Sequence, residues 1–118
     1  EELKRITFYK TSLWLPHKNK NHPRTIEGIV EMVGYEKDRS DIPKPFLLIK
    51  DSTIKVKWKT SIFHSHLTSQ IERRVLRNDE FNTGDKIRII WVGERETNYE
   101  NPQYRYEIEV IEKSVRSR

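Results

Sequence analysis

The sequence contains no cysteine, which excludes disulfide bonds and thiolate metal sites. It has no apolar run long enough to span a membrane and no pattern typical of a signal peptide. None of the glycine-rich loops that cradle phosphate groups is present either. We therefore expect no covalent cross-links, no membrane segment and no nucleotide-binding loop, and an intracellular location in the cytoplasm or the nucleus.

The residue types that usually carry catalysis or bind metal ions form no recognisable site. No nucleophile elbow and no zinc-binding helix motif occurs. His64 and His66 are two residues apart, so on a helix their imidazoles diverge by about 200° and cannot chelate one ion. His17 and His22 lie in a polar stretch without an evident partner. We interpret all four histidines as surface residues and predict no enzymatic activity, no cofactor and no bound metal.

The composition is polar and basic, with enough aromatic residues to build a core. Charged residues make up 35% of the chain, hydrophobic residues 34% and aromatic residues 10%. This balance is typical of a small β-rich domain whose core depends on a few large side chains. With 118 residues the chain suits one compact domain rather than two. The net charge of +5 favours a polyanion as partner but does not name one.

Three lysines alternate with apolar residues in the stretch 53–60. Lys55, Lys57 and Lys59 each follow an apolar residue. Because successive side chains of a strand point to opposite faces, the stretch predicts a strand with one apolar face and a row of ammonium groups on the other. Such a row repels itself and becomes favourable when a polyanion lies across it. Lysines also blunt exposed strand edges, but this strand is expected inside a hairpin, so we favour nucleic acid as the partner.

Hydrophobic patterning predicts five main strands, one helix and a further N-terminal strand or arm. The strands are expected at residues 26–35, 46–49, 53–59, 86–92 and 104–110. Apolar residues at helical spacing predict a helix over residues 62–76, after Ser61 as a candidate N-cap. Gly28 and Gly34 lie within the first of these strands and indicate sharp coiling, a bulge or a close backbone approach.

The order of these elements predicts a mainly β fold. Five strands with one α-helix between strands 3 and 4 is the order of the oligonucleotide-binding (OB) barrel, a five-stranded Greek-key barrel. A six-stranded SH3-like barrel and a two-layer α+β sheet are the alternatives. We expect an N-terminal arm or extra strand in residues 1–25, the barrel in residues 26–112 and a basic tail in residues 113–118.

Part of the chain resembles the OB domains of the replication protein A and anticodon-binding type. The resemblance covers a glycine-containing strand at residues 26–34, an apolar strand that ends in Asp51 and a strand that ends at Trp58. The Thr-Gly-Asp turn at residues 83–85 is similar to the entry into their fourth strand. The turn after Asp51 departs from the family pattern because it contains no glycine. The resemblance implies that nucleic acid crosses strands 2 and 3 and is clamped by the loops between strands 1 and 2 and between strands 4 and 5.

The residues and the resemblance together indicate a candidate nucleic-acid-binding surface. Phosphate contacts are expected from the strand lysines, from Arg88 and from cations of the two loops. Aromatic residues in or beside these loops are expected to stack on bases. The predicted binding residues are Lys55, Lys57, Lys59, Arg88, Tyr35, Phe46, Lys37, Arg39, Lys44, Arg95 and Tyr99. Five other aromatic residues fall on apolar faces and are predicted for the core: Trp58, Phe63, Trp91, Tyr104 and Tyr106.

The expected function is binding of single-stranded nucleic acid. We expect one OB barrel that binds DNA in preference to RNA, largely without sequence specificity, in replication, repair or recombination. The alternative is an OB scaffold or accessory subunit in a replication or telomere-type assembly. In that case the N-terminal arm is expected to dock a protein partner or a second copy of the chain. Neither expectation involves a membrane.

Overall fold

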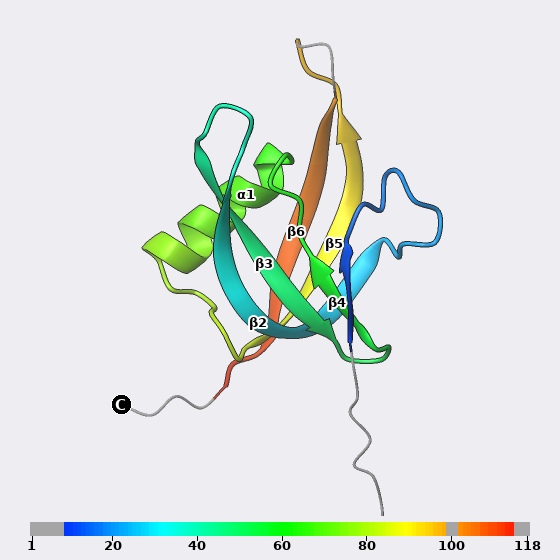
Figure 1. Ribbon diagram of the computed structural model, residues 1–118, viewed down its shortest axis with the longest axis vertical. Helices are drawn as coiled ribbons and strands as arrows, with labels where there is room; N and C mark the ends of the chain where they lie inside the picture. Colours follow the sequence, from blue (N-terminus) through cyan, green and yellow to red (C-terminus); the bar gives the residue numbers. More distant parts are fainter. Residues whose placement is uncertain (1–8, 99–101, 115–118) are drawn as a thin grey trace, which may run out of the picture.

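The computed structural model describes residues 9–98 and 102–114, which form a six-stranded mixed sheet with one helix (Figure 1). The strands are β1 (Lys10–Leu13), β2 (Thr25–Lys37), β3 (Pro43–Asp51), β4 (Val56–Lys59), β5 (Lys86–Arg95) and β6 (Gln103–Glu112). The helix α1 (Ser65–Ile71) follows β4 and continues as a π-helical segment, η1 (Glu72–Arg77). The prediction of a mainly β fold is therefore confirmed.

The strands lie in the order β1-β4-β3-β2-β5-β6 across the sheet. Every neighbouring pair is antiparallel except β1 and β4, which run parallel. In the part of the chain that is described, β1 and β6 are the two edges and do not pair, so the sheet is not the closed barrel that we expected. Because β1 precedes the other strands, the helix lies between the fourth and fifth strands of this sheet rather than between the third and fourth.

The long strand β2 bends across the sheet because two glycines allow a close approach of other groups (Figure 1). Its first residues pair with β5 and the later ones with β3, and the two pairings overlap around Gly28. A Cβ atom at Gly28 would lie 2.0 Å from the carbonyl oxygen of Lys50, so no side chain fits there. A Cβ atom at Gly34 would lie 2.6 Å from the ring of Phe46. The expected close backbone approach is thus confirmed at Gly28, whereas at Gly34 the close neighbour is a side-chain ring.

The core lies between the inner face of the bent sheet and the helix. Its buried apolar side chains are Trp14, Ile26, Val30, Leu47, Ile49, Trp58, Leu67, Ile71, Val75, Phe81, Ile87, Ile89, Tyr106 and Ile108. Trp14 comes from the predicted arm, yet its indole packs 5.5 Å from the Tyr106 ring and donates a hydrogen bond to the carbonyl of Pro23 (2.8 Å). The described part of the arm, residues 9–25, therefore belongs to the same folded body.

Side chains of the helix cover the free edge of β6. His66 Nδ1 accepts a hydrogen bond from the backbone N–H of Tyr106 (2.9 Å), and the Gln70 amide donates to the Tyr106 carbonyl (2.7 Å). One turn further along, the Arg74 guanidinium donates to the carbonyl of Ile108 (2.6 Å). Residues four apart share one side of a helix, so the three together satisfy backbone groups that would otherwise form an unpaired edge. The helix thus takes the place of strand pairing where the sheet stays open.

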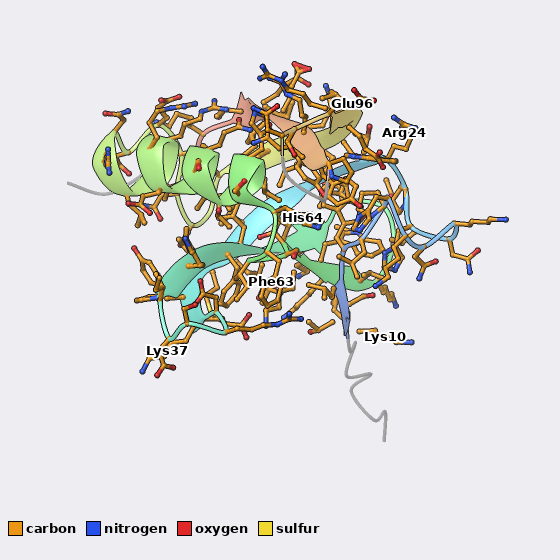
Figure 2. All side chains as sticks on the ribbon, turned by 90° about the horizontal axis from the view of Figure 1, so that it is seen from above. Lys10, Arg24, Lys37, Phe63, His64 and Glu96 are labelled. Carbon is orange, nitrogen blue, oxygen red and sulfur yellow. The ribbon has the colours of Figure 1, made fainter. Side chains whose placement is uncertain are left out.

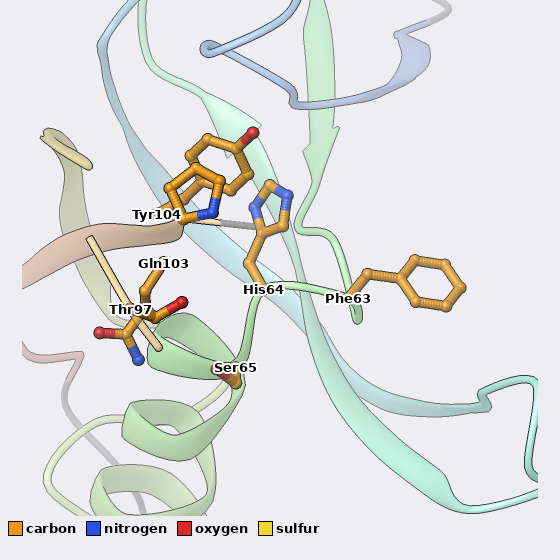
Figure 3. Close-up of a pocket in the computed structure, with 7 residues that line it drawn as sticks. Phe63, His64, Ser65, Thr97, Gln103 and Tyr104 are labelled. Carbon is orange, nitrogen blue, oxygen red and sulfur yellow. The ribbon is translucent and has the colours of Figure 1, made fainter. Parts of the chain in front are cut away.

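The helix begins later than the sequence pattern predicts. Ser61 is not its N-cap, because α1 begins at Ser65. The Ser61 hydroxyl instead accepts a hydrogen bond from the N–H of Phe63 (3.1 Å) and forms a local turn. Phe63 and His64 therefore lie in the connection between β4 and α1, at the end of the molecule seen in Figure 2. Their side chains point away from each other (Figure 3).

Candidate functional site

The lysines of β4 are neutralised by carboxylates on β2. Lys57 forms an ion pair with Glu31 (3.0 Å), and Lys59 forms one with Glu36 (2.7 Å). The lysine side chains reach these glutamates across β3, which lies between the two strands. Lys55 precedes β4 and lies in a bend. The predicted row of three free ammonium groups is therefore wrong, because the pattern of one strand does not reveal the charges that a nearby strand places beside it.

Asp51 holds the tight turn between β3 and β4. One carboxylate oxygen accepts hydrogen bonds from the N–H and the hydroxyl of Thr53 (2.8 and 2.9 Å), and the other accepts one from the indole of Trp58 (2.8 Å). Burial opposes ionisation of this carboxyl, but the hydrogen bonds together outweigh it and lower the pKa of Asp51. The side chain thus shapes a turn that has no glycine, and β4 starts only after Lys55.

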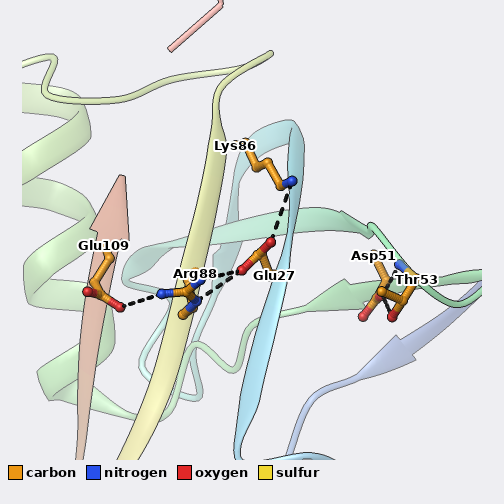
Figure 4. Close-up of polar contacts among 6 residues, drawn as sticks. All are labelled: Glu27, Asp51, Thr53, Lys86, Arg88 and Glu109. Carbon is orange, nitrogen blue, oxygen red and sulfur yellow. Dashed lines mark hydrogen bonds and ion pairs between the residues drawn. The ribbon is translucent and has the colours of Figure 1, made fainter. Parts of the chain in front are cut away.

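Arg88 lies in a second neutralised row on the outer face of the sheet (Figure 4). Its guanidinium contacts Glu27 on β2 (2.8 Å) and Glu109 on β6 (3.3 Å), and Lys86 also reaches Glu27 (3.5 Å). The hydrogen bond between Arg88 and Glu27 is the main cause of a raised pKa of Arg88 and a lowered pKa of Glu27. Arg88 is therefore not the free phosphate contact that we predicted.

The structure changes which aromatic rings are accessible. Tyr35 is 55% exposed, but Phe46 is only 8% exposed because its ring packs over β2 beneath the ammonium group of Lys59. Phe46 is therefore not available for stacking. Phe63, predicted for the core, is 63% exposed because it precedes the helix instead of lying on its buried side. Tyr99, the remaining predicted stacking residue, lies outside the described residues.

Phe63 lines three hollows at the end of the molecule that faces the viewer in Figure 2. The first, of about 420 Å³, lies toward the β5–β6 connection. The second, of about 300 Å³, lies toward the ends of β1 and β4, and the third, of about 340 Å³, toward the β2–β3 connection. Because Phe63 lines all three, we call them together the Phe63 cleft.

Cations border the Phe63 cleft on the side of the β2–β3 connection. The Arg39 guanidinium lies 5.8 Å from the ring centroid of Phe63, and Lys37 lines the second hollow. Neither cation forms an ion pair with another described residue. The Asp38 carboxylate of the same loop accepts hydrogen bonds from two backbone N–H groups, which lower its pKa. The other predicted loop cations, Lys44 and Arg95, are likewise without an ion pair within residues 9–98 and 102–114.

Partly buried rings form the wall of the cleft beside Phe63 (Figure 3). His64 Nδ1 lies 2.6 Å from the hydroxyl of Tyr106. The ring centroid of His17 lies 4.1 Å from that of Tyr104 and 4.8 Å from that of His64. Burial, with a smaller effect of His17, lowers the pKa of His64 to about 4, so its imidazole is neutral at pH 7.

All four histidines are partly exposed and make specific contacts with other described residues. His22 accepts a hydrogen bond from a backbone N–H of its own loop (3.0 Å), and His66 accepts one from Tyr106 (2.9 Å). Trp91, predicted for the core like Tyr104, is partly buried at the border of the core. Three connections and β6 meet here only in the folded chain, and no spacing in the sequence signals this cluster of rings.

Among the residues described, no group of three or more His, Asp or Glu side chains is placed to hold a metal ion. No helix in the same part of the chain is both long and apolar enough to cross a membrane. No family model, no curated protein and no solved structure matches the chain. The geometry of the Phe63 cleft is therefore the basis for a functional proposal.

Proposed function

We propose that the protein binds single-stranded nucleic acid, DNA or RNA, in the Phe63 cleft. The observation that carries the proposal is the position of Phe63, which is 63% exposed between three hollows and adjoins Arg39 and Lys37. Proteins that bind single strands combine rings on which bases stack with cations that follow the phosphates. Both kinds of group meet in this cleft.

The strand order supports comparison with an OB barrel that is open on one side. Five of the strands pair in the order β4-β3-β2-β5-β6. In the OB fold, a partly open barrel, the ligand is held by strands 2 and 3 and by the loops between strands 1 and 2 and between strands 4 and 5. Counted without β1, these loops are the β2–β3 and β5–β6 connections, and both contribute to the Phe63 cleft. We therefore interpret the protein as an OB-type domain whose ligand lies toward the open end.

The outer face of the sheet is a poorer surface for a polyanion. Exposed ion pairs such as those of Lys57 and Lys59 contribute roughly 0–1 kcal/mol each, so a phosphate can displace the carboxylates. Glu31 and Glu36 would then remain unpaired beside the phosphates and repel them. Glu36 and Asp38 also line the cleft, but Lys37 and Arg39 form no ion pair with a described residue and need not leave a carboxylate to meet a phosphate. We therefore assign the phosphate contacts mainly to these two cations.

Replacing Phe63 with alanine tests the proposal. Fluorescent dT and rU strands and a duplex of equal length are titrated at two salt concentrations and followed by anisotropy. Loss of one stacked base costs about 1–3 kcal/mol, so Phe63→Ala should weaken single-strand binding about tenfold or more. Tyr35→Ala is the matched control, because Tyr35 is also exposed but lines none of the three hollows. Equal losses in both variants, or tighter binding of the duplex, would contradict the proposal.

Protein docking is a second candidate function, and the outer face favours it. Four residues are cross-strand neighbours on this face: Leu13, Lys59, Leu48 and Met32. Leu13 and Met32 are each 45% exposed. An apolar and charge-balanced sheet face suits a protein partner in a replication or telomere-type assembly better than it suits phosphate. Met32→Glu separates the two candidates. It should abolish self-association or partner binding in sedimentation experiments and leave oligonucleotide affinity unchanged.

A further inference from the structure

The first hollow of the Phe63 cleft differs from the other two in its charge (Figure 3). Phe63 and Tyr104 line it, although the Phe63 ring points away from Tyr104 (Figure 3), and its polar groups include His64, Ser65 and Gln103. None of its described lining residues is a Lys, Arg, Asp or Glu, and His64 is neutral at pH 7. The other two hollows are lined by charged side chains of both signs: Glu36, Lys37 and Lys59 in the second, and Asp38 and Arg39 in the third. A neutral hollow lined by rings suits a flat, uncharged group and not a phosphate.

The side-chain amide of Gln103 offers hydrogen-bonding groups that the described part of the chain does not use. It has no hydrogen bond to another described residue. The amide of Gln70, by contrast, donates to the carbonyls of His66 (3.2 Å) and Tyr106 (2.7 Å). A primary amide presents two donors and an acceptor, and it can pair side by side with the edge of a nucleobase. The hollow therefore combines surfaces for stacking with a group that can read a base edge.

The size and position of the hollow fit one base of a bound strand. Its volume of about 420 Å³ lies above the lower limit of roughly 300 Å³ for small-ligand sites. Through Phe63 it adjoins the two hollows that carry Lys37 and Arg39. A strand whose phosphates follow these cations can place one base past Phe63 without moving its backbone away from them.

We propose that the first hollow receives a single unstacked nucleobase, with Tyr104 against one face, Phe63 beside it and Gln103 at its edge. The inference rests on the proposed function and adds selectivity for the base at one position of the strand. The remaining bases are bound without preference, since stacking on exposed rings tolerates any base.

An abasic scan with matched variants tests this inference. Strands of dT are shortened until the loss of one more nucleotide weakens binding, which fixes their register on the protein. A second set carries one abasic residue at each position in turn, and a third varies the base at the most sensitive position. Wild type, Gln103→Ala and Ser65→Ala are compared with Ser69→Ala, which changes an exposed serine one turn further along α1 that does not line this hollow.

One position should lose about tenfold more affinity than the others when its base is absent. The four bases should differ about tenfold at that position, as a side-chain amide discriminates between base edges. Gln103→Ala should reduce this difference and leave the affinity for the abasic strand unchanged, while Ser69→Ala should alter neither. Equal losses at every position, with Phe63→Ala still weakening binding, would overturn the nucleobase pocket and keep the proposed function. No binding of any strand would overturn both.

Discussion

The outer face of the sheet and the Phe63 cleft both carry cations and carboxylates, but they differ in which cations form ion pairs. Lys57, Lys59 and Arg88 have glutamate oxygens at 3.0, 2.7 and 2.8 Å. Lys37 and Arg39, at the cleft, form no ion pair within the described chain. Whether the cations are paired with carboxylates, more than the number of cations, therefore decides where a basic protein can hold a polyanion.

Removing equal charge from the cleft and from a separate surface should give the largest difference in oligonucleotide binding. Lys37→Gln with Arg39→Gln removes two phosphate contacts, so the plot of log K against log salt should become shallower by about 1.4, at about 0.7 per contact. Arg73→Gln with Arg77→Gln makes the same change of charge in a surface hollow on the helix. This control should leave the slope nearly unchanged. Similar slopes in the two variants would mean that net charge, and not the cleft, drives binding.

The pH dependence of stability is the next largest expected difference, and it arises at the cleft. The pKa of His64 is lowered from 6.5 to about 4 in the folded protein. Between these values the unfolded chain binds a proton that the folded chain does not, so the free energy of unfolding falls as the pH falls. After allowance for the partial exposure of the ring, the loss is on the order of 1–2 kcal/mol. His64→Gln should remove most of it in urea unfolding measured at pH 7 and at pH 4.5.

The outer face should respond in a different pH window. Pairing with Arg88 lowers the pKa of Glu27 below its ordinary value of 4.5. The contribution of the ionised Glu27 carboxylate to stability is therefore present above pH 4.5, and it is lost only as the pH falls through the lowered pKa of Glu27. Glu27→Gln should leave the change between pH 7 and pH 4.5 as in the wild type. If Glu27→Gln abolished that change and His64→Gln did not, the assignment of the two windows would be reversed.

The alternation of apolar and polar residues predicted the strands because each strand carries this two-residue repeat within its own sequence. The segments expected at residues 26–35, 86–92 and 104–110 lie within β2, β5 and β6. A repeat of two residues depends only on which face of the strand meets the core, and it is therefore visible without knowledge of the neighbouring strands. Gly28 was informative for a similar reason, since a glycine in an otherwise apolar strand marks a place where another backbone approaches.

The candidate site could not be predicted in the same way, because its parts meet only through pairing of distant segments. The ion pair of Lys59 and Glu36 joins residues 23 apart in the chain and depends on the order β4-β3-β2. The exposure of Phe63 depends on whether Ser61 caps a helix or its hydroxyl accepts a hydrogen bond from the N–H of Phe63. The same sequence fits both arrangements. Gln103 looks like any polar residue at the start of a strand until the fold places it in a hollow.

Removal of two carboxylates from the outer face should have the smallest effect on oligonucleotide binding. Glu31→Gln with Glu36→Gln frees the ammonium groups of Lys57 and Lys59 without altering their number. If these carboxylates are what keeps the outer face from binding a polyanion, oligonucleotide affinity should rise a few-fold. The salt slope should steepen by up to about 1.4 when both lysines contact phosphate. The free energy of unfolding should change little, because exposed ion pairs contribute roughly 0–1 kcal/mol.

A control is needed because this double variant also raises the net charge. Glu107→Gln with Glu112→Gln adds the same charge at two exposed positions of β6 and should raise affinity less. The reciprocal variant, Lys57→Gln with Lys59→Gln, should lower affinity only slightly, because each ammonium group must leave a glutamate before it meets a phosphate. A loss as large as that of the cleft variant would erase the difference between the two regions. The lysine strand would then be the main binding surface in spite of its ion pairs.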